Sequence, residues 1–160
     1  RGEVWIRGPQ VMKGYWRREE ETRETLPGGW LRTGDVGYMD EDGHFFLVDR
    51  LKDLIICSGY NVYPRNIEEA IYLHSAVAEV TVIGIHDDYR GEAPKAFVKL
   101  KEGETLEEMA LIEFLADKLS KIEIPSSIEF RSELPKTMIG KLSKKELKAE
   151  ESTKQEHLDS

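Results

Sequence analysis

Hydrophobic and polar residues in the first third of the chain alternate in short runs that are separated by turn residues. Residues 36–39 and 44–48 form two apolar runs on either side of an acidic turn that ends in Gly43. This pattern predicts a β-hairpin with a positive φ at the glycine. Residues 19–26, between two breakers, favour one short helix. We therefore expect this part of the chain to be β-rich.

After residues 50–53 the spacing changes to strand-like runs that alternate with amphipathic helical segments. Pro64 suits the first turn of a helix, and apolar residues follow it at helical spacing. An exposed polar loop is expected over residues 87–92. Strands are expected at residues 54–57, 77–85, 96–100 and 128–130.

Two capping signals mark further helices. Thr105 and Glu108 have the spacing of a capping box and precede an apolar stripe, which predicts the longest helix of the chain. Ser143 and Glu146 repeat that spacing. Lys141 is therefore expected in the loop just before a short final helix.

The change of pattern near residue 51 is the best place for a domain boundary. We expect an α+β fold in which residues 1–50 are the β-rich end of a large domain. Residues 51–149 should form a small three-layer-like domain, with a short mixed sheet covered by helices. Residues 150–160 are a polar tail that is expected to fray.

Composition and charge exclude several classes of function. A formal net charge of -8 and a pI near 5.1 disfavour a nucleic-acid partner, because such binding needs clustered Lys and Arg. No stretch approaches the roughly 20 apolar residues that span a bilayer, and no signal sequence opens the chain. We therefore expect a cytoplasmic protein. The chain starts without an initiator Met on a strand-like segment, which predicts a piece of a larger protein.

The sequence lacks several common catalytic and metal-binding patterns. Cys57 is the single cysteine and is expected to be a small buried hydrophobic residue. The four histidines have no metal-ligand spacing, so no metal site is expected from this chain alone. Neither a nucleophile elbow nor a dinucleotide-binding glycine pattern is present, which disfavours hydrolases and Rossmann-type enzymes.

Four places carry side chains that suit a phosphorylated ligand. The carboxylate of Asp35, which follows a glycine, can accept hydrogen bonds from two ribose hydroxyls. Arg50 lies in a cluster of alternating charges and can bind a sugar hydroxyl or a phosphate. The other two places are Lys141, in a loop after Gly140, and the segment Ser58, Gly59 and Tyr60 after a strand end. Each place also has an ordinary structural alternative: a turn cap for Asp35, a hydrated linker for the charges around Arg50, a simple turn for residues 58–60 and a solvated side chain for Lys141.

The order and spacing of these signals resemble the carboxyl-terminal part of the adenylate-forming superfamily along nearly the whole chain. Four motifs occur in the family's order, at residues 2–16, 29–35, 49–53 and 134–141. Within the superfamily, residues 59–64 and 86–92 are most similar to fatty acyl-CoA synthetases, the long-chain type in particular.

The resemblance implies an AMP-forming acid:CoA ligase that uses ATP and CoA in two steps. A fatty acid first attacks the α-phosphate of ATP, and CoA then displaces AMP from the acyl-adenylate. By motif position, Lys141 is the catalytic lysine that bridges the carboxylate and the α-phosphate. Asp35 and Arg50 bind the ribose of ATP or AMP, and Lys52 is the hinge. The residues that face CoA are Ser58, Gly59 and Tyr60.

This sequence departs from the family pattern in two places. Many relatives have Asp where Lys52 stands, and Lys is an accepted variant there. Residues 142–145 differ from the commoner ending of the last motif, so Lys144 and Lys145 are assigned no role. The family's phosphate loop, magnesium-binding glutamate and acyl pocket all precede this chain. Mg2+ is thus expected in the full enzyme without ligands from this chain, which should be inactive alone.

Two other functions stay open from the sequence. An adenylation domain that loads a carrier protein, or a luciferase-like enzyme, shares the same motifs. These are distinguished from a CoA ligase by comparing CoA with carrier-bound pantetheine as the acceptor. A free-standing nucleotide-binding or interaction module belongs to another class, and it requires tight AMP or CoA binding by the isolated chain. The oligomeric state is not predicted.

Overall fold

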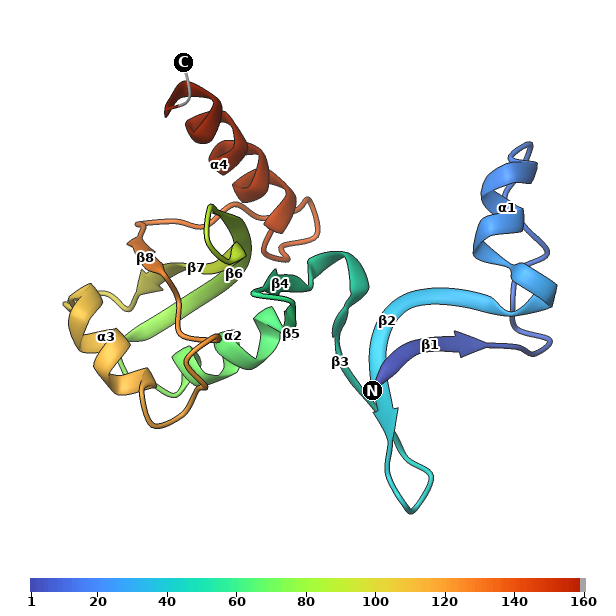
Figure 1. The fold of residues 1–160 in the computed structure, drawn as a ribbon, viewed down its shortest axis with the longest axis horizontal. Helices are drawn as coiled ribbons and strands as arrows, with labels where there is room; N and C mark the ends of the chain where they lie inside the picture. The colour runs from blue at the N-terminus through green and yellow to red at the C-terminus, as the bar shows by residue number, and fades with distance from the viewer. Residues whose placement is uncertain (159–160) are drawn as a thin grey trace. The chain divides into compact units, whose positions relative to one another are not determined.

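The computed structural model describes residues 1–158 and divides into two compact units. Unit 1 comprises Arg1–Lys52, and unit 2 begins at Asp53 (Figure 1). The mixed α+β class predicted from the sequence is confirmed. Among the described residues, no helix is long and apolar enough to cross a membrane.

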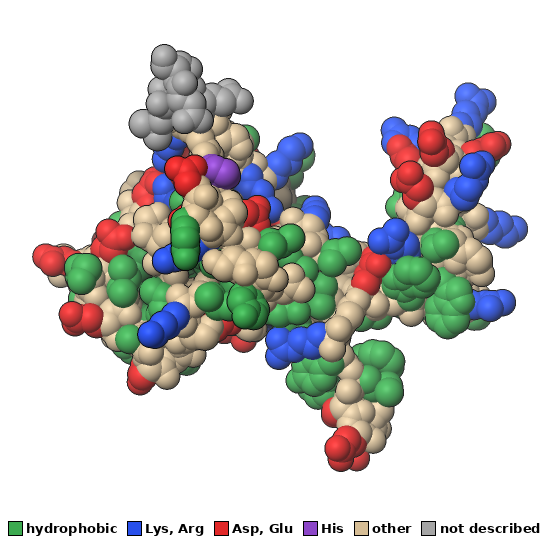
Figure 2. Space-filling view, in the orientation of Figure 1, with side chains coloured by type: hydrophobic (Ala, Val, Ile, Leu, Met, Phe, Trp, Pro, Cys, Tyr) green, Lys and Arg blue, Asp and Glu red, His purple; other side chains and the backbone are tan. Residues whose placement is uncertain are grey.

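Unit 1 is built on a three-stranded antiparallel sheet with β2 in the middle. Its strands are β1 (Gly2–Ile6), β2 (Leu31–Met39) and β3 (Phe45–Arg50), and helix α1 (Glu19–Thr25) and the 3-10 turn η1 (Pro27–Gly29) connect β1 to β2. The predicted hairpin is confirmed, because β2 and β3 pair antiparallel and Gly43 has a φ of 85°. The predicted short helix is α1, which buries no residue and carries mixed charges on its surface (Figure 2).

Unit 2 contains a five-stranded sheet in the order β5-β4-β7-β6, with β8 also beside β7. Its strands are β4 (Ile55–Cys57), β5 (Tyr60–Val62), β6 (Val77–Asp87), β7 (Gly91–Leu100) and β8 (Ser127–Phe130), and the 3-10 turn η2 (Leu51–Asp53) precedes β4. β8 runs parallel to β7 and the other pairs are antiparallel, so the sheet is mixed as predicted. The polar loop between β6 and β7 is shorter than expected, because Asp87 accepts the backbone N–H groups of Tyr89 and Arg90 and closes a tight turn.

Helices cover both faces of this sheet. Helices α2 (Pro64–Tyr72) and α3 (Glu108–Leu115) pack on one face, and α4 (Lys144–Leu158) packs on the other. The first core lies between the sheet and helices α2 and α3, and the second lies between the sheet and α4. Side chains alternate along β6, so Val82 faces the first core and Ile83 the second. On β7, Val98 faces the first core and Phe97 faces the second. Cys57 is fully buried in the first core, as expected of a small hydrophobic residue.

The capping box predicted for the third helix was wrong. Helix α3 begins at Glu108 and has no side-chain cap. Glu108 Oε1 instead accepts the backbone N–H of Ile128 at 2.8 Å, so its carboxylate binds strand β8. Helix α3 ends at Leu115, and the longest helix is α4, with 15 residues.

The polar segment from residue 150 does not fray where the structure describes it, because α4 continues to Leu158. Its acidic side chains bind cations on the sheet. Lys95 Nζ lies 2.8 Å from Glu151 and 2.9 Å from Glu129, and Arg131 binds both Glu129 and Glu150. These ion pairs hold α4 against the sheet of unit 2. The sequence of this segment is so polar that it did not by itself predict a packed helix. Residues 159 and 160 of the predicted tail lie outside the described residues.

The Glu129 ion pairs predict an acid-sensitive contribution to stability. Burial by itself would raise the pKa of Glu129, but hydrogen bonds from Lys95 and Arg131 lower it to about 2. A depressed carboxyl pKa stabilises the fold above the unfolded value near 4.5, and this contribution disappears as the pH falls from 4.5 toward 2. We expect Glu129→Gln to lower the free energy of unfolding by about 1–3 kcal/mol at pH 7 and by about half as much at pH 3.

Denaturant unfolding at pH 7 and pH 3 measures this difference. Glu102→Gln, which alters an exposed carboxylate after β7, is the control and should unfold like the unchanged chain at both pH values. Equal losses of stability for Glu129→Gln at the two pH values would contradict the prediction.

Candidate functional site

Lys141 lies at the end of a tight hairpin loop in unit 2. The N–H of Thr137 donates to the C=O of Lys141 at 2.7 Å, and the N–H of Gly140 donates to the C=O of Thr137 at 2.8 Å. Gly140 has a φ of 79°, a conformation that a side chain disfavours, and this explains the glycine before Lys141. Thr137 Oγ1 also accepts the N–H of Lys141. The loop therefore presents an exposed ammonium group from an ordered backbone.

The base of this loop is fixed to the second core of unit 2. Lys136 and Leu142 pair across it in an isolated bridge, and the N–H of Ser143 donates to the C=O of Pro135. Leu142 packs on the core that contains Leu134, Leu147, Ile83 and Phe97. Helix α4 starts at Lys144, so the prediction that Lys141 lies in the loop just before the final helix is confirmed. That helix is not short, as its 15 residues show.

Two ion pairs beside Lys141 were missed from the sequence. Lys136 Nζ lies 2.6 Å from Glu79 Oε1, and this hydrogen bond raises the pKa of Lys136 above its ordinary value. Lys144 Nζ lies 2.7 Å from Glu68 Oε1. Lys144 was assigned no role because residues 142–145 depart from the family pattern, and its partner Glu68 is distant along the chain. The only early signal was that Lys136 lies within the motif at 134–141 and that Lys144 follows it closely.

Asp35 and Arg50 come together in unit 1. They lie opposite each other in the β2–β3 register, and Arg50 Nε is 3.4 Å from Asp35 Oδ1. The N–H of Asp35 donates to Thr33 Oγ1, which itself donates to the C=O of Val4. Both charged side chains remain partly exposed. A carboxylate acceptor thus lies beside a guanidinium donor, an arrangement suited to a ligand with adjacent hydroxyl groups.

Lys52 is the last residue of unit 1 and lies in the 3-10 turn η2. The division between the units therefore falls directly after it, two positions beyond the boundary expected at residue 50. A small cavity of about 250 Å³ in unit 1 is lined by Gly34, Arg50, Leu51 and Lys52. The hinge role of Lys52 stays a prediction.

Ser58 and Gly59 form the two-residue turn of the β4–β5 hairpin. Their φ values of 52° and 80° are both positive, as a type I′ turn requires. The N–H of Ser58 donates to the C=O of Arg90 at 2.7 Å, which fixes the turn to the end of the β6–β7 hairpin. Tyr60 follows with 64% of its surface exposed. The sequence indicated a turn here but not strand β5, which is only three residues long.

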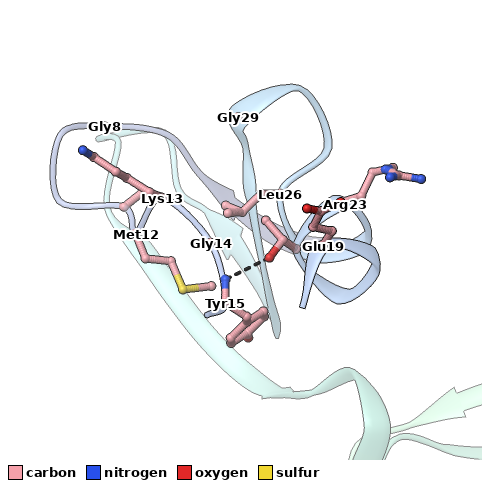
Figure 3. A pocket seen from close by; sticks show the side chains of 11 residues that line it. Gly8, Met12, Lys13, Gly14, Tyr15, Glu19, Arg23, Leu26 and Gly29 are labelled. Carbon is pink, nitrogen blue, oxygen red and sulfur yellow. Dashed lines mark hydrogen bonds between the residues drawn. The ribbon is translucent and has the colours of Figure 1, made fainter. Parts of the chain in front are cut away.

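A cavity of unit 1 is lined partly by residues of the first motif. Its volume is about 630 Å³, and it lies between the loop that follows β1 and helix α1 (Figure 3). The N–H of Tyr15 donates to Thr22 Oγ1 at 2.8 Å and closes one side. Lys13, Glu19 and Arg23 line it together with Met12. This mixture of both charges and apolar surface selects no class of ligand.

One group of side chains in the described residues has the proximity of metal ligands. Asp40, Asp42 and His44 place their ligand atoms within 4.8 Å of one another in the β2–β3 turn. Asp40 Oδ1 already accepts the backbone N–H groups of Asp42 and His44, so the turn itself explains the cluster. The cluster lies beyond the carboxyl end of β2, whereas Asp35 is within that strand.

Comparison with known proteins identifies the family. Residues 66–141, which run from α2 to Lys141, match the AMP-binding enzyme C-terminal domain. The chain belongs to the adenylate-forming enzymes. The matched segment ends on Lys141, the residue that the motif at 134–141 singles out, and includes the β6–β7 hairpin and α3 of unit 2.

Relatives among the adenylate-forming enzymes differ in substrate. The chain is 51% identical to a long-chain-fatty-acid–CoA ligase of Bacillus subtilis over 98% of its length, and 45% identical to a 2-succinylbenzoate–CoA ligase of Geobacillus kaustophilus over 92%. It also matches the structure of an amide bond synthetase from Marinactinospora thermotolerans, with 43% identity over 92% of this chain and a TM-score of 0.85. The chain covers 28% of the first relative and 30% of each of the other two.

Proposed function

We propose that this chain supplies the catalytic lysine and the CoA-facing surface of an ATP-dependent fatty acid:CoA ligase, and that it is inactive alone. In this proposal residues 1–50 close the large domain, residues 51–149 form the small adenylation domain, and the missing large domain is the partner. The observation that carries the proposal is Lys141, an exposed ammonium at the end of an ordered hairpin, within a family named for AMP binding.

The surface of unit 1 supports its assignment to a larger domain. Apolar side chains gather on the β2–β3 hairpin (Figure 2). Phe45 and Leu47 are 69% and 56% exposed, and Tyr38 and Phe46 stack on each other at 5.1 Å between ring centroids while both remain exposed. Exposed apolar patches of this kind mark surfaces that another protein part covers.

Adenylation is the step assigned to Lys141. A carboxylate oxygen of the acid attacks the α-phosphorus of ATP, the bond to the bridging oxygen breaks, and pyrophosphate leaves. Negative charge accumulates on the oxygens around phosphorus, and the Lys141 ammonium offsets it. Such preorganised electrostatic stabilisation is worth about 3 kcal/mol or more. Asp35 accepts hydrogen bonds from the ribose hydroxyls, and Arg50 orients the same ribose.

Thioester formation is the second step. The sulfur of CoA attacks the acyl carbon, the acyl–phosphate bond breaks, and AMP leaves with the electron pair. Ser58, Gly59 and Tyr60 are the proposed CoA-facing residues, because a two-residue turn exposes backbone groups beside an aromatic ring. Lys52 is the proposed hinge between the two steps. Magnesium is expected with ATP through ligands outside this chain, and the cytoplasmic location stays a prediction.

A hybrid enzyme tests the roles proposed for this chain, whereas the acyl pocket that selects the acid comes from the relative. In it, this chain replaces the matching carboxyl-terminal part of the Bacillus subtilis relative. We expect AMP formation that depends on a long-chain fatty acid and on CoA, and no activity from the chain alone. Failure of the hybrid to form AMP with any acid would overturn the proposal.

The acyl acceptor needs its own comparison, because one structural neighbour is named an amide bond synthetase. The hybrid is therefore supplied with CoA, with carrier-bound pantetheine and with an amine. CoA should give the fastest product formation. A preference for the pantetheine carrier would instead favour an adenylation domain that loads a carrier protein.

Asp35→Ala should weaken nucleotide binding in the hybrid. The change removes the acceptor of two ribose hydroxyls, and a hydrogen bond to a charged group is worth about 1.5–3 kcal/mol. We expect the KM for ATP to rise about 10-fold to 100-fold, because each 1.4 kcal/mol of lost binding free energy is a factor of ten. Steady-state kinetics measures it, with Asp42→Asn in the exposed β2–β3 turn as the control. An unchanged KM for ATP would remove Asp35 from the ribose site.

A further inference from the structure

The segment that carries Lys141 is tied down on both sides by ion pairs. Before it, Lys136 binds Glu79 of strand β6 at 2.6 Å, and after it, Lys144 binds Glu68 of helix α2 at 2.7 Å. Neither pair includes Lys141 itself. The two carboxylates come from elements far from the hairpin in sequence, so they fix the segment relative to the body of unit 2.

Glu68 is held in place by the edge of the sheet. Strand β6 is the last in the order β5-β4-β7-β6, so among the described residues one side of it has no neighbouring strand. The N–H of Val82 donates to Glu68 Oε1 at 2.9 Å, and the N–H of Val80 donates to the hydroxyl of Tyr72 at 3.2 Å. The oxygen that binds Lys144 is thus the same oxygen that caps β6, which leaves it little freedom to move.

The buried oxygen of Glu79 carries a cost in the free energy of folding. Its Oε2 atom is buried and has no hydrogen-bond partner in the described part of the chain, whereas Oε1 binds Lys136. An unsatisfied buried acceptor costs about 1–3 kcal/mol. An ion pair with a side chain as exposed as Lys136 returns about 0–1 kcal/mol. The ion pair with Lys136 connects strand β6 to the hairpin, so Glu79 is suited to placing the hairpin.

We propose that Glu79 and Glu68 are positioning residues for adenylation, which hold Lys141 in place through Lys136 and Lys144. The inference rests on the proposed function, since it concerns the same step. The lysine must offset charge at one point in the transition state, and a displacement of about 1 Å can cost on the order of 100-fold in rate. CoA attack does not use Lys141, so it should not depend on these pairs.

The hybrid enzyme separates this role from a structural one. Glu79→Gln and Glu68→Gln keep side-chain shape and remove the charge. We expect each to lower the rate of acyl-adenylate formation about 10-fold to 100-fold, with the KM for ATP unchanged. The rate of thioester formation from supplied acyl-adenylate and CoA should stay within about twofold, because placement of Lys141 affects only the first step. Glu69→Gln breaks an exposed pair with Arg65 on the same helix and is the matched control.

Restoring the pair is a second measurement. Lys136→Arg should retain most of the adenylation rate. Glu79→Lys combined with Lys136→Glu should recover part of the rate lost in Glu79→Gln. Thermal unfolding of every variant is recorded in parallel.

Three outcomes would overturn the inference. The first is normal adenylation in Glu79→Gln and Glu68→Gln. The second is an equal loss in both steps together with a lower melting temperature, which would indicate a purely structural role. The third is faster adenylation in Glu79→Gln, because a released Lys136 would then itself contact the substrate. Normal adenylation in Lys141→Ala would defeat the proposed function instead, so the two failures are distinguishable.

Discussion

Lys141→Ala should lower acyl-adenylate formation by the hybrid enzyme by about 100-fold to 1,000-fold, the cost of removing one preorganised electrostatic group from a transition state. The ammonium group is exposed at the end of a hydrogen-bonded hairpin and serves no packing role there. Pyrophosphate release in a single turnover measures the loss. Conversion of supplied acyl-adenylate and CoA to thioester should change less than about twofold, since its charge development lies elsewhere.

Lys145→Ala is the matched control for this change. Lys145 is also an exposed lysine and follows in the first turn of α4, so loss of one positive charge near the loop is common to both variants. Its adenylation rate should stay near that of the unchanged hybrid. Equal rates for Lys141→Ala and the unchanged hybrid would remove Lys141 from the reaction.

Leu147→Ala should destabilise unit 2 by about 2–5 kcal/mol, the range for truncating a fully buried leucine. Leu147 is completely buried and is the residue of α4 in the second core, where it packs with Ile83, Phe97 and Leu134. The rest of α4 is largely polar and relies on ion pairs. Removing the leucine side chain should therefore loosen both the helix and the base of the Lys141 hairpin.

Hydrogen exchange of the β6 and β7 amides measures this destabilisation within unit 2. Lys145→Ala, on the exposed side of the same helix, should change stability by less than about 0.5 kcal/mol. Unchanged protection of β6 and β7 in Leu147→Ala would contradict the prediction.

The sequence by itself determined the features that depend on local chemistry. The acidic turn with Gly43 predicted the β2–β3 hairpin, and Pro64 marked the start of α2, because turn and helix-start preferences act over a few residues. The spacing of Ser143 and Glu146 also placed Lys141 in a loop before a helix. The Thr105 capping box failed for the complementary reason. Glu108 obtained a better partner in the N–H of Ile128, a residue that local spacing cannot reveal.

Only the tertiary structure decided which distant residues meet. Asp35 and Arg50 are neighbours because β2 and β3 pair in one particular register, and Lys136 and Lys144 find Glu79 and Glu68 through the packing of the hairpin and α4 on the sheet. The polar end of α4 is helical because Lys95 and Arg131 lie beneath it. The spacing of charged residues along the sequence does not predict which opposite charges they will contact. Ion pairs between distant residues are therefore identified only in the folded structure.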